Sequence, residues 1–228
     1  MTRRTRDLAG LAVAFLAAAG CVRLGFWQLD RLRGRRARNA HVEAARARPP
    51  IELTGYGRSA DSAVNRRVRA RGSYDYDHEQ LWRARSYEGA PGVSLITPLR
   101  LPDGSAVLVD RGWVPSPDAF HVDQRAYRES AAAEVVGLGV DVPRGKGDVD
   151  PRTLADSLPY PLLPFVLQRL PPARRRPAAS LFGSARPPLP WPPPELGDGP
   201  HLSYAVQWFS FAVIIVVGSI ALYRRQGR

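Results

Sequence analysis

The chain has very little sulfur, and this shortage excludes two kinds of protein. Among 228 residues there is one methionine and one cysteine, Cys21. A single thiol forms no internal disulfide and no metal site that needs a pair of cysteines. Cys21 lies in an apolar stretch, where a small buried hydrophobic residue is the expected role.

Lysine is almost absent as well, although the formal net charge is +12. Lys146 is the only lysine, and the other basic residues are arginines scattered along the chain. A nucleic-acid-binding protein instead gathers its basic residues on one face or along one helix. The excess of arginine, alanine, proline and glycine is typical of a GC-rich genome. We therefore exclude nucleic acid as a partner.

Motifs for common enzyme chemistry are missing too. The sequence has no nucleophile elbow, no phosphate-binding loop and no zinc-ligand spacing. Asp75, Asp77, His78 and Glu79 form an acidic cluster with one histidine, and such oxygen and nitrogen ligands suit a metal ion. A solvated turn between strands explains the same residues. We expect a protein that is not an enzyme and keep an enzyme built on this cluster as an alternative.

Two apolar segments of membrane length lie near the ends of the chain. Arg23 is the one charged residue within residues 8–29, and it lies close enough to one end for its side chain to reach the headgroups. Phe26 and Trp27 suit an interfacial aromatic belt. Residues 202–223 carry no formal charge. Since about 20 apolar residues cross a bilayer core, we predict a transmembrane helix over each segment.

A signal peptide is the alternative for the first segment. Arg3, Arg4 and Arg6 form a basic start, and residues 18–21 resemble a lipoprotein cleavage box. The length of the apolar stretch and its flanking residues favour an uncleaved anchor.

The arginines around these segments predict the topology. Arg224, Arg225 and Arg228 follow the second segment, and the start of the chain is also basic. The positive-inside rule places both ends in the cytoplasm. The arginines within residues 31–38 flank the first segment on the outer side, where a long translocated domain tolerates them. We predict a multi-pass protein of the cytoplasmic membrane with an extracytoplasmic central domain, residues 30–200.

The central domain shows the alternation of β-strands. Residues 68–74 alternate small or apolar with polar side chains, and residues 80–85 are a short possible partner. Residues 93–101 and 105–110 flank Pro102-Asp103-Gly104, which has strong turn chemistry and predicts a hairpin. A further strand is expected over residues 134–142. The fold class that follows is membrane α+β, with two transmembrane helices flanking a mainly antiparallel β domain.

Proline sets further expectations for this domain. Pro98 donates no hydrogen bond, so its strand is expected at a sheet edge or at a bulge. Residues 159–170 are apolar but contain three prolines, and we interpret them as an arm that packs on the sheet or touches the membrane. Residues 171–200 are predicted to be an extended proline-rich linker.

His201 is the main candidate for a functional side chain, because it stands at the boundary of the second span. Tyr204 lies one helical turn further and Trp208 two turns further. A neutral imidazole is a good axial ligand for haem iron, and aromatic side chains can flank a porphyrin. The alternative is an interfacial histidine solvated by headgroups. Ser203, Gln207 and Ser210 share one helix face, which suggests a helix contact, unless the serines bond to their own backbone.

Four strings now align with one family. They are Leu-Gly-Phe-Trp-Gln-Leu at 24–29, Ile-Thr-Pro-Leu-Arg-Leu at 96–101, Val-Leu-Val-Asp-Arg-Gly-Trp-Val at 107–114, and His-Leu-Ser-Tyr-Ala-Val-Gln-Trp-Phe at 201–209. In order and spacing, residues 8–223 resemble the surfeit locus protein family of cytochrome c oxidase assembly factors, in a bacterial, actinobacterial-like form.

The resemblance implies a role in building haem-copper oxidase. It implies that haem a is bound through His201 and inserted into the catalytic subunit, with oxidase subunit I and haem A synthase as partners. Tyr204 and Trp208 are expected to line the ring and Arg111 to pair with propionates. The alternative is a cofactor-free membrane scaffold for an assembly intermediate. Trp27, Gln28, Gly112 and Trp113 also match, without an assigned role. Residues 197–200 depart from the family, where many members have asparagines.

Overall fold

The structure is a computed structural model that describes residues 3–57, 60, 62–142, 149–171 and 187–226. The chain divides into two compact units. One contains the residues up to Val42 together with those from Glu195 onward, and the other runs from Glu43 to Pro194. Each unit is described below by itself.

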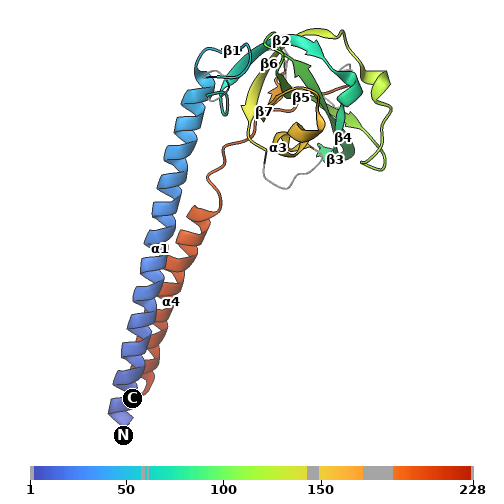
Figure 1. Cartoon of the computed structure of the whole chain (residues 1–228). Helices are drawn as coiled ribbons and strands as arrows, with labels where there is room; N and C mark the ends of the chain where they lie inside the picture. Colours follow the sequence, from blue (N-terminus) through green and yellow to red (C-terminus); the bar gives the residue numbers. More distant parts are fainter. Residues whose placement is uncertain (1–2, 58–59, 61, 143–148, 172–186, 227–228) are drawn as a thin grey trace. The chain divides into compact units, whose positions relative to one another are not determined.

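The first unit is a pair of long helices. Helix α1 runs from Arg3 to Ala47 and helix α4 from His201 to Gln226. Neither helix contains proline. Pro49-Pro50 follow α1, where the missing N–H groups prevent continuation, and Pro200 precedes α4, where a helix start needs no N–H. Figure 1 shows the two helices antiparallel and side by side, with the start of α1 and the end of α4 together.

Both helices are long and apolar enough to cross a membrane. The qualifying segments are Leu8–Ala47 and His201–Arg225, and most of their apolar side chains are exposed. Exposed apolar side chains on such helices are stable in lipid rather than in water. The two helices therefore mark a membrane protein. The first helix continues beyond its apolar segment through polar residues to Ala47.

The second unit is built on a seven-stranded sheet within the described residues (Figure 1), in the order β1-β2-β6-β7-β5-β4-β3. Short helical turns lie between some strands. The strands are β1 Ile51–Leu53, β2 Arg67–Tyr74, β3 Gln80–Tyr87, β4 Ala90–Arg100, β5 Ala106–Pro115, β6 Ala132–Val140 and β7 Leu162–Arg169, and the turns are η1 Tyr76–His78, η2 Gln124–Tyr127, α3 Pro151–Leu154 and η4 Ala155–Ser157.

The sheet is mostly antiparallel, with parallel pairing only in β1–β2 and β5–β7 among the described strands. An additional β2–β4 pairing joins two strands that are distant in the sheet order, which closes a ring of β2, β6, β7, β5 and β4. Closure removes exposed edges from these five strands. The predicted membrane α+β class, with two helices flanking a mainly antiparallel β domain, is confirmed.

The predicted strands and hairpin are present. Most strands are longer than predicted, whereas β6 has the predicted length and begins two residues earlier. The turn Pro102-Asp103-Gly104 joins β4 to β5, and the Asp103 carboxylate accepts from the backbone N–H of Ser105 at 3.0 Å. The main core of the unit contains Val68, Leu99 and Phe165, all buried. Burial of such side chains contributes about 1.5–3 kcal/mol each to folding.

Pro98 does not place β4 at a sheet edge, so that half of the expectation is wrong. Strand β4 pairs with both β3 and β5. Pairing with β3 ends at Ile96, so no β3 residue needs an N–H from Pro98. A bulge is also present nearby, because the β4–β5 register changes between Leu95 and Ile96 and leaves Arg111 as the extra residue.

The apolar segment 159–170 is a strand rather than a surface arm, which corrects its interpretation. Its larger part is β7, which lies between β6 and β5. Pro164 is exposed and falls in a register irregularity of the β5–β7 pair, between the partners of Ala106 and Leu108. An irregularity tolerates the missing donor of proline, so the prolines did not exclude a central strand.

Of the proline-rich segment 171–200, the structure describes Pro171 and the residues from 187 onward. Leu189 forms an isolated bridge with Trp113, and Trp191 donates from Nε1 to Ser94 Oγ at 2.6 Å. Gln168 donates to the carbonyl of Pro192 at 2.9 Å. This part of the predicted linker therefore packs on the sheet of its own unit.

Candidate functional site

The two membrane helices meet through the motif strings of residues 24–29 and 201–209. A Cβ placed on Gly25 would lie 2.6 Å from Cε1 of Phe209, so this position accepts no side chain without a shift. The ring of Phe26 meets that of Phe209 edge to face at 5.4 Å. Small residues allow helices in lipid to approach closely. Gly25 thus sets the separation of α1 and α4 beside the predicted site.

His201 is the first residue of α4 and is bonded to α1. Its Nδ1 lies 2.9 Å from Oε1 of Gln28. The side-chain amide oxygen of glutamine only accepts hydrogen bonds, so this contact places a proton on Nδ1. Among the described residues, none bonds to Nε2 of His201. That nitrogen keeps its lone pair for a ligand.

The turn that leads into α4 is fastened to α1 by several polar contacts. Arg35 donates from Nε to the carbonyl of Gly197 at 2.8 Å, and Asn39 donates to the same carbonyl at 3.2 Å. Arg36 pairs with Asp198 at 2.8 Å. The groups that accept these bonds belong to Gly197 and Asp198, just before α4. The contacts fix the backbone that carries His201.

Gly199 gives the ring of His201 its room. Its φ of +71° is a conformation that favours glycine. A Cβ built on this residue would lie 3.6 Å from Cδ2 and 3.7 Å from Nε2 of His201, and 3.8 Å from Nε of Arg35. A side chain at this position would therefore touch both the imidazole of His201 and the guanidinium of Arg35.

Tyr204 and Trp208 lie on α4 as the spacing predicted, but they differ in exposure. The face of α4 that packs on α1 contains the buried residues Ala205 and Ala212. Trp208, two turns from His201, is on this face and half-buried, with its ring edge to face with Phe211 at 5.9 Å. Tyr204 is 46% exposed. Both side chains are available on the helix surface.

The face of Ser203, Gln207 and Ser210 is not the contact face with α1. Ser203 donates to the carbonyl of Pro200 at 2.8 Å and Ser210 to that of Val206 at 2.9 Å. The serines thus satisfy themselves on their own helix, which was the alternative. Gln207 is exposed and is left as the polar group of this face.

Arg111 lies in the second unit with a fully buried side chain. Its Nη1 donates to Oε2 of Glu79 at 2.9 Å, and its Nη2 donates to the carbonyl of Tyr127. The rings of Tyr74 and Tyr76 lie over the guanidinium at 5.4 and 5.2 Å. This enclosure supports a structural role. A propionate partner at Arg111 stays a prediction that requires the ion pair to open.

The acidic cluster around His78 organises a turn. The carboxylate of Asp75 accepts from the backbone N–H of Asp77 and lies 2.9 Å from Nδ1 of His78. It also accepts from the hydroxyl of Tyr160 at 3.0 Å. Burial opposes ionisation of Asp75, but these hydrogen bonds together lower its pKa. Over the described residues, no group of three or more His, Cys, Asp or Glu is arranged to hold a metal ion.

A second buried carboxylate lies beside the bulge of Arg111. Asp110 accepts from the backbone N–H of Gly112 at 3.0 Å and is 4% exposed. Burial raises its pKa to about 7, although Arg85 and the Gly112 hydrogen bond oppose this shift. The guanidinium of Arg85 lies between the rings of Trp82 and Trp191. The sequence showed this group only as part of a strand.

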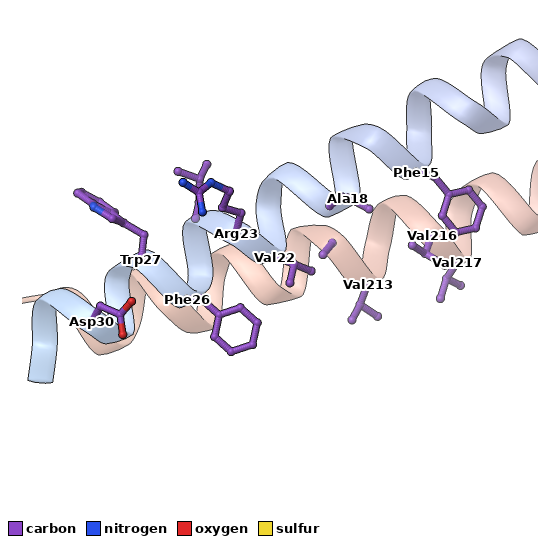
Figure 2. Close-up of a pocket in the computed structure, with 13 residues that line it drawn as sticks. Phe15, Ala18, Val22, Arg23, Phe26, Trp27, Asp30, Val213, Val216 and Val217 are labelled. Carbon is purple, nitrogen blue, oxygen red and sulfur yellow. The ribbon is translucent and has the colours of Figure 1, made fainter.

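An apolar groove of about 1230 Å³ runs along the two helices (Figure 2). Phe15 and Phe26 are among its lining residues on α1, and Val213, Val216 and Val217 are among those on α4. The lining also includes Trp27 and Asp30, on either side of Gln28 in the chain, whereas His201, Tyr204 and Trp208 are not part of it. The groove therefore begins within a helical turn of the His201 partner and continues toward the middle of the span.

Sequence reasoning left Gln28 without a role and did not single out Arg35 or Asn39. A signal for Gln28 was present, because a polar amide in an otherwise apolar membrane segment usually has a partner. The partners of Arg35 and Asn39 are backbone carbonyls more than 150 residues away in the chain. Spacing along the sequence does not reveal such contacts.

Comparison with known proteins matches most of the chain to one family. Residues 15–213 match the SURF1 family. The chain is 28% identical over 230 residues to an uncharacterized SURF1-like protein of Mycobacterium tuberculosis, covering 92% of this chain and 80% of that protein. It is 26% identical over 226 residues to a SURF1-like protein of Monosiga brevicollis, covering 90% and 84%.

A shorter match joins these two. A SURF1-like protein of Rickettsia felis is 27% identical over 119 residues, which is 51% of this chain and 50% of that protein. The family match covers part of each long helix and the whole β unit between them. The chain therefore belongs to the SURF1 family, and this membership implies a role in cytochrome oxidase assembly.

Proposed function

We propose that this protein carries haem a during assembly of cytochrome oxidase, with His201 as an axial ligand to the iron. The observation that carries the proposal is the state of His201. Its Nδ1 is held by Gln28 at 2.9 Å, and no described residue bonds to Nε2. Neutral imidazole with one free nitrogen is the usual haem ligand. The proposed activity is binding and transfer, without catalysis.

The residues around His201 fit a haem group. Gly199 places no Cβ beside Nε2 of His201, where one would lie 3.7 Å away. Trp208 is half-buried on the same helix face, and Tyr204 is exposed one turn along. Flat aromatic side chains pack well against a flat ring. A single protein ligand also suits transfer, because one bond to iron is replaced more easily than two.

The groove supports a ligand with a long apolar tail, as haem a has. Its floor contains Ala18, Ala19 and Val22, between Phe15 and Phe26. Those two rings are eleven residues apart, or about 16 Å along an α-helix. A flexible hydrocarbon chain that leaves the haem near His201 has an apolar surface to lie on in this groove.

The propionates of the haem are anionic, so the proposal needs cationic side chains close to His201. Arg35 is bordered by the same glycine as the Nε2 edge of His201. Its guanidinium uses Nε for the Gly197 carbonyl, and no contact of its terminal nitrogens appears among the described residues. Charge-assisted bonds to carboxylates favour arginine. We propose Arg35 as a propionate partner, since the charge of Arg111 is already neutralised by Glu79.

The proposed topology follows the arginines at the ends of the chain. Both helix ends that lie together in Figure 1 carry basic residues. The positive-inside rule puts this end in the cytoplasm. The β unit and His201 are then on the outer side of the cytoplasmic membrane. Oxidase subunit I is the proposed receiver of the haem, and haem A synthase its source.

A cofactor-free scaffold is the second candidate. Gln207 is exposed on α4, near the exposed apolar side chains of Val206 and Val213. A polar group on an apolar helix surface favours contact with another membrane helix. This function needs Gln207 but not the free nitrogen of His201.

The experiment that separates the two is a visible spectrum of the full chain, purified in detergent after co-expression with a haem A synthase. We expect a haem a spectrum in the wild type and its loss in His201→Ala. The matched control is His121→Ala, since His121 is exposed and its ring pairs with the carboxylate of Asp118 in the part of the chain that the structure describes. Absence of haem in the wild type would leave the scaffold. Equal haem in both variants would remove His201 from the site.

A further inference from the structure

We propose that Gln28 in the first membrane helix is the positioning residue of the His201 ligand. In this view Gln28 selects the imidazole tautomer that leaves Nε2 unprotonated, and it fixes the direction of that nitrogen. The inference rests on the proposed function only for what binds at Nε2. The arrangement of the proton stands on the geometry of the two side chains.

The proton assignment follows from the chemistry of the contact. The atoms 2.9 Å apart are Nδ1 of His201 and Oε1 of Gln28. A carbonyl oxygen has no proton to give, so the donor is Nδ1–H. A neutral imidazole carries one proton, and Nε2 is then the acceptor. The tautomer with the proton on Nε2 would lose this hydrogen bond and would offer no lone pair at Nε2.

Gln28 is directed at α4 by the packing of its neighbours. Gly25 and Leu32, three residues before and four after, are buried. Residues at these spacings share one helix face. The Gly25–Phe209 contact holds the helices close on one side of Gln28. The Arg35–Gly197 bond holds the entry to α4 on the other side. The acceptor is therefore fixed from both directions along α1.

The hydrogen bond between His201 and Gln28 resembles one that is common in metal sites. A histidine that binds metal usually donates its other N–H to a carbonyl or carboxylate, which orients the ring and makes the ligand more basic. Loss of such a partner typically reduces metal affinity about 10- to 100-fold. The amide of Gln28 has the position of this partner. The first membrane helix is thus part of the ligand site, although it contributes no atom to the iron.

A helix contact without any role in ligation is the alternative explanation, since polar side chains also join membrane helices. Two substitutions distinguish these roles. Gln28→Glu keeps an acceptor for Nδ1–H, whereas Gln28→Leu removes it with a similar volume. Gln207→Leu is the matched control, because Gln207 is an exposed glutamine on the partner helix.

The first measurement uses the haem-free full chain in detergent, labelled with ¹⁵N-histidine, at about pH 8 where an ordinary histidine is neutral. His201→Ala identifies the signals of His201. We expect Nδ1–H and an unprotonated Nε2 in the wild type, in Gln28→Glu and in Gln207→Leu. We expect a mixture of tautomers in Gln28→Leu. An unchanged tautomer in Gln28→Leu would overturn the proposal.

The second measurement is haem a retention by the same variants. We expect Gln28→Leu to bind at least about 10-fold more weakly and Gln28→Glu to retain near wild-type binding. Equal loss in both Gln28 variants, with an intact tautomer, would indicate packing and would contradict the positioning role. If His201→Ala keeps its haem, the proposed function fails, while the tautomer result still decides the role of Gln28.

Discussion

Arg111 and Glu79 form a buried ion pair in which 2.9 Å separates Nη1 from Oε2, and their side chains are 0% and 2% exposed. Thr97 also donates to the same carboxylate oxygen. The pair joins the bulge of β5 to the start of β3, at Gln80. A charge left unpaired in such a place is costly, because protein cannot replace its hydration.

Glu79→Ala is therefore expected to destabilise the β unit by about 3–5 kcal/mol, since the buried Arg111 would keep only the longer contact of 3.6 Å to the partly exposed Glu129. Denaturant titration of the full chain in detergent, followed by tryptophan fluorescence, measures this change. Glu134→Ala is the control, because Glu134 forms exposed pairs with Arg69 and Arg71. Exposed pairs contribute about 0–1 kcal/mol. A similar small effect in both variants would contradict a structural role for the Arg111 pair.

The stability of the β unit should fall as pH rises from about 4 to about 7 because of Asp110. Its folded pKa of about 7 lies above the ordinary 3.8. Between these values the unfolded state loses its proton while the folded state keeps it, so folding becomes less favourable. The loss is complete above about pH 7. The difference in unfolding free energy between wild type and Asp110→Asn isolates this contribution.

Asp110→Asn keeps an acceptor for the Gly112 N–H and removes the titration. We expect the variant to be more stable than the wild type at pH 8, by at most about 4 kcal/mol from the size of the shift, and the gap to close near pH 4. Other carboxylates have lowered pKa values, among them Asp75 and Asp103, and they contribute equally to both proteins. A constant gap across this range would show that Asp110 is ionised in the folded state.

Gly25→Leu should separate the two membrane helices. Its side chain would overlap the ring of Phe209, which lies 2.6 Å from the position of a Cβ. Overpacking of this kind costs about 1–3 kcal/mol. Gly20→Leu is the matched control, because nothing lies within 4 Å of a Cβ at Gly20. SDS titration of both variants in mixed micelles measures the loss of helix association. If both variants lose helix association at the same SDS concentration, α1 and α4 do not pack at Gly25.

Gly199→Ala should weaken the turn that carries His201. An alanine at a φ of +71° costs about 1 kcal/mol relative to glycine. Gly197→Ala is a close control, since Gly197 does not have a positive φ and a Cβ built on it would lie 4.0 Å from the nearest atom, the backbone N of Gly199. The measurement is the ¹⁵N signal of His201, which should broaden or shift in Gly199→Ala alone. The same shift in both variants would assign the effect to the segment as a whole.

Hydrophobic length and strand alternation are enough to predict much of this protein. Apolar runs at 8–29 and 202–223 determine the two long helices, because only a helix satisfies its backbone in lipid. The turn at Pro102-Asp103-Gly104 and the alternation around it determine the β4–β5 hairpin. These features depend on residues close together in the chain. The family strings also pointed to His201.

Tertiary structure decided what depends on distant partners. Most of segment 159–170 forms a central strand, because Pro164 lies where the register of the β5–β7 pair is irregular. The local sequence does not show this irregularity. Arg111 became an enclosed cation because Glu79, 32 residues earlier, is buried against it. Gln28 meets His201 across 173 residues. The sequence by itself determined which residue types were available for ligation and packing. Only the packing of two antiparallel helices and a closed sheet decided which of them meet, since those contacts join residues far apart in the chain.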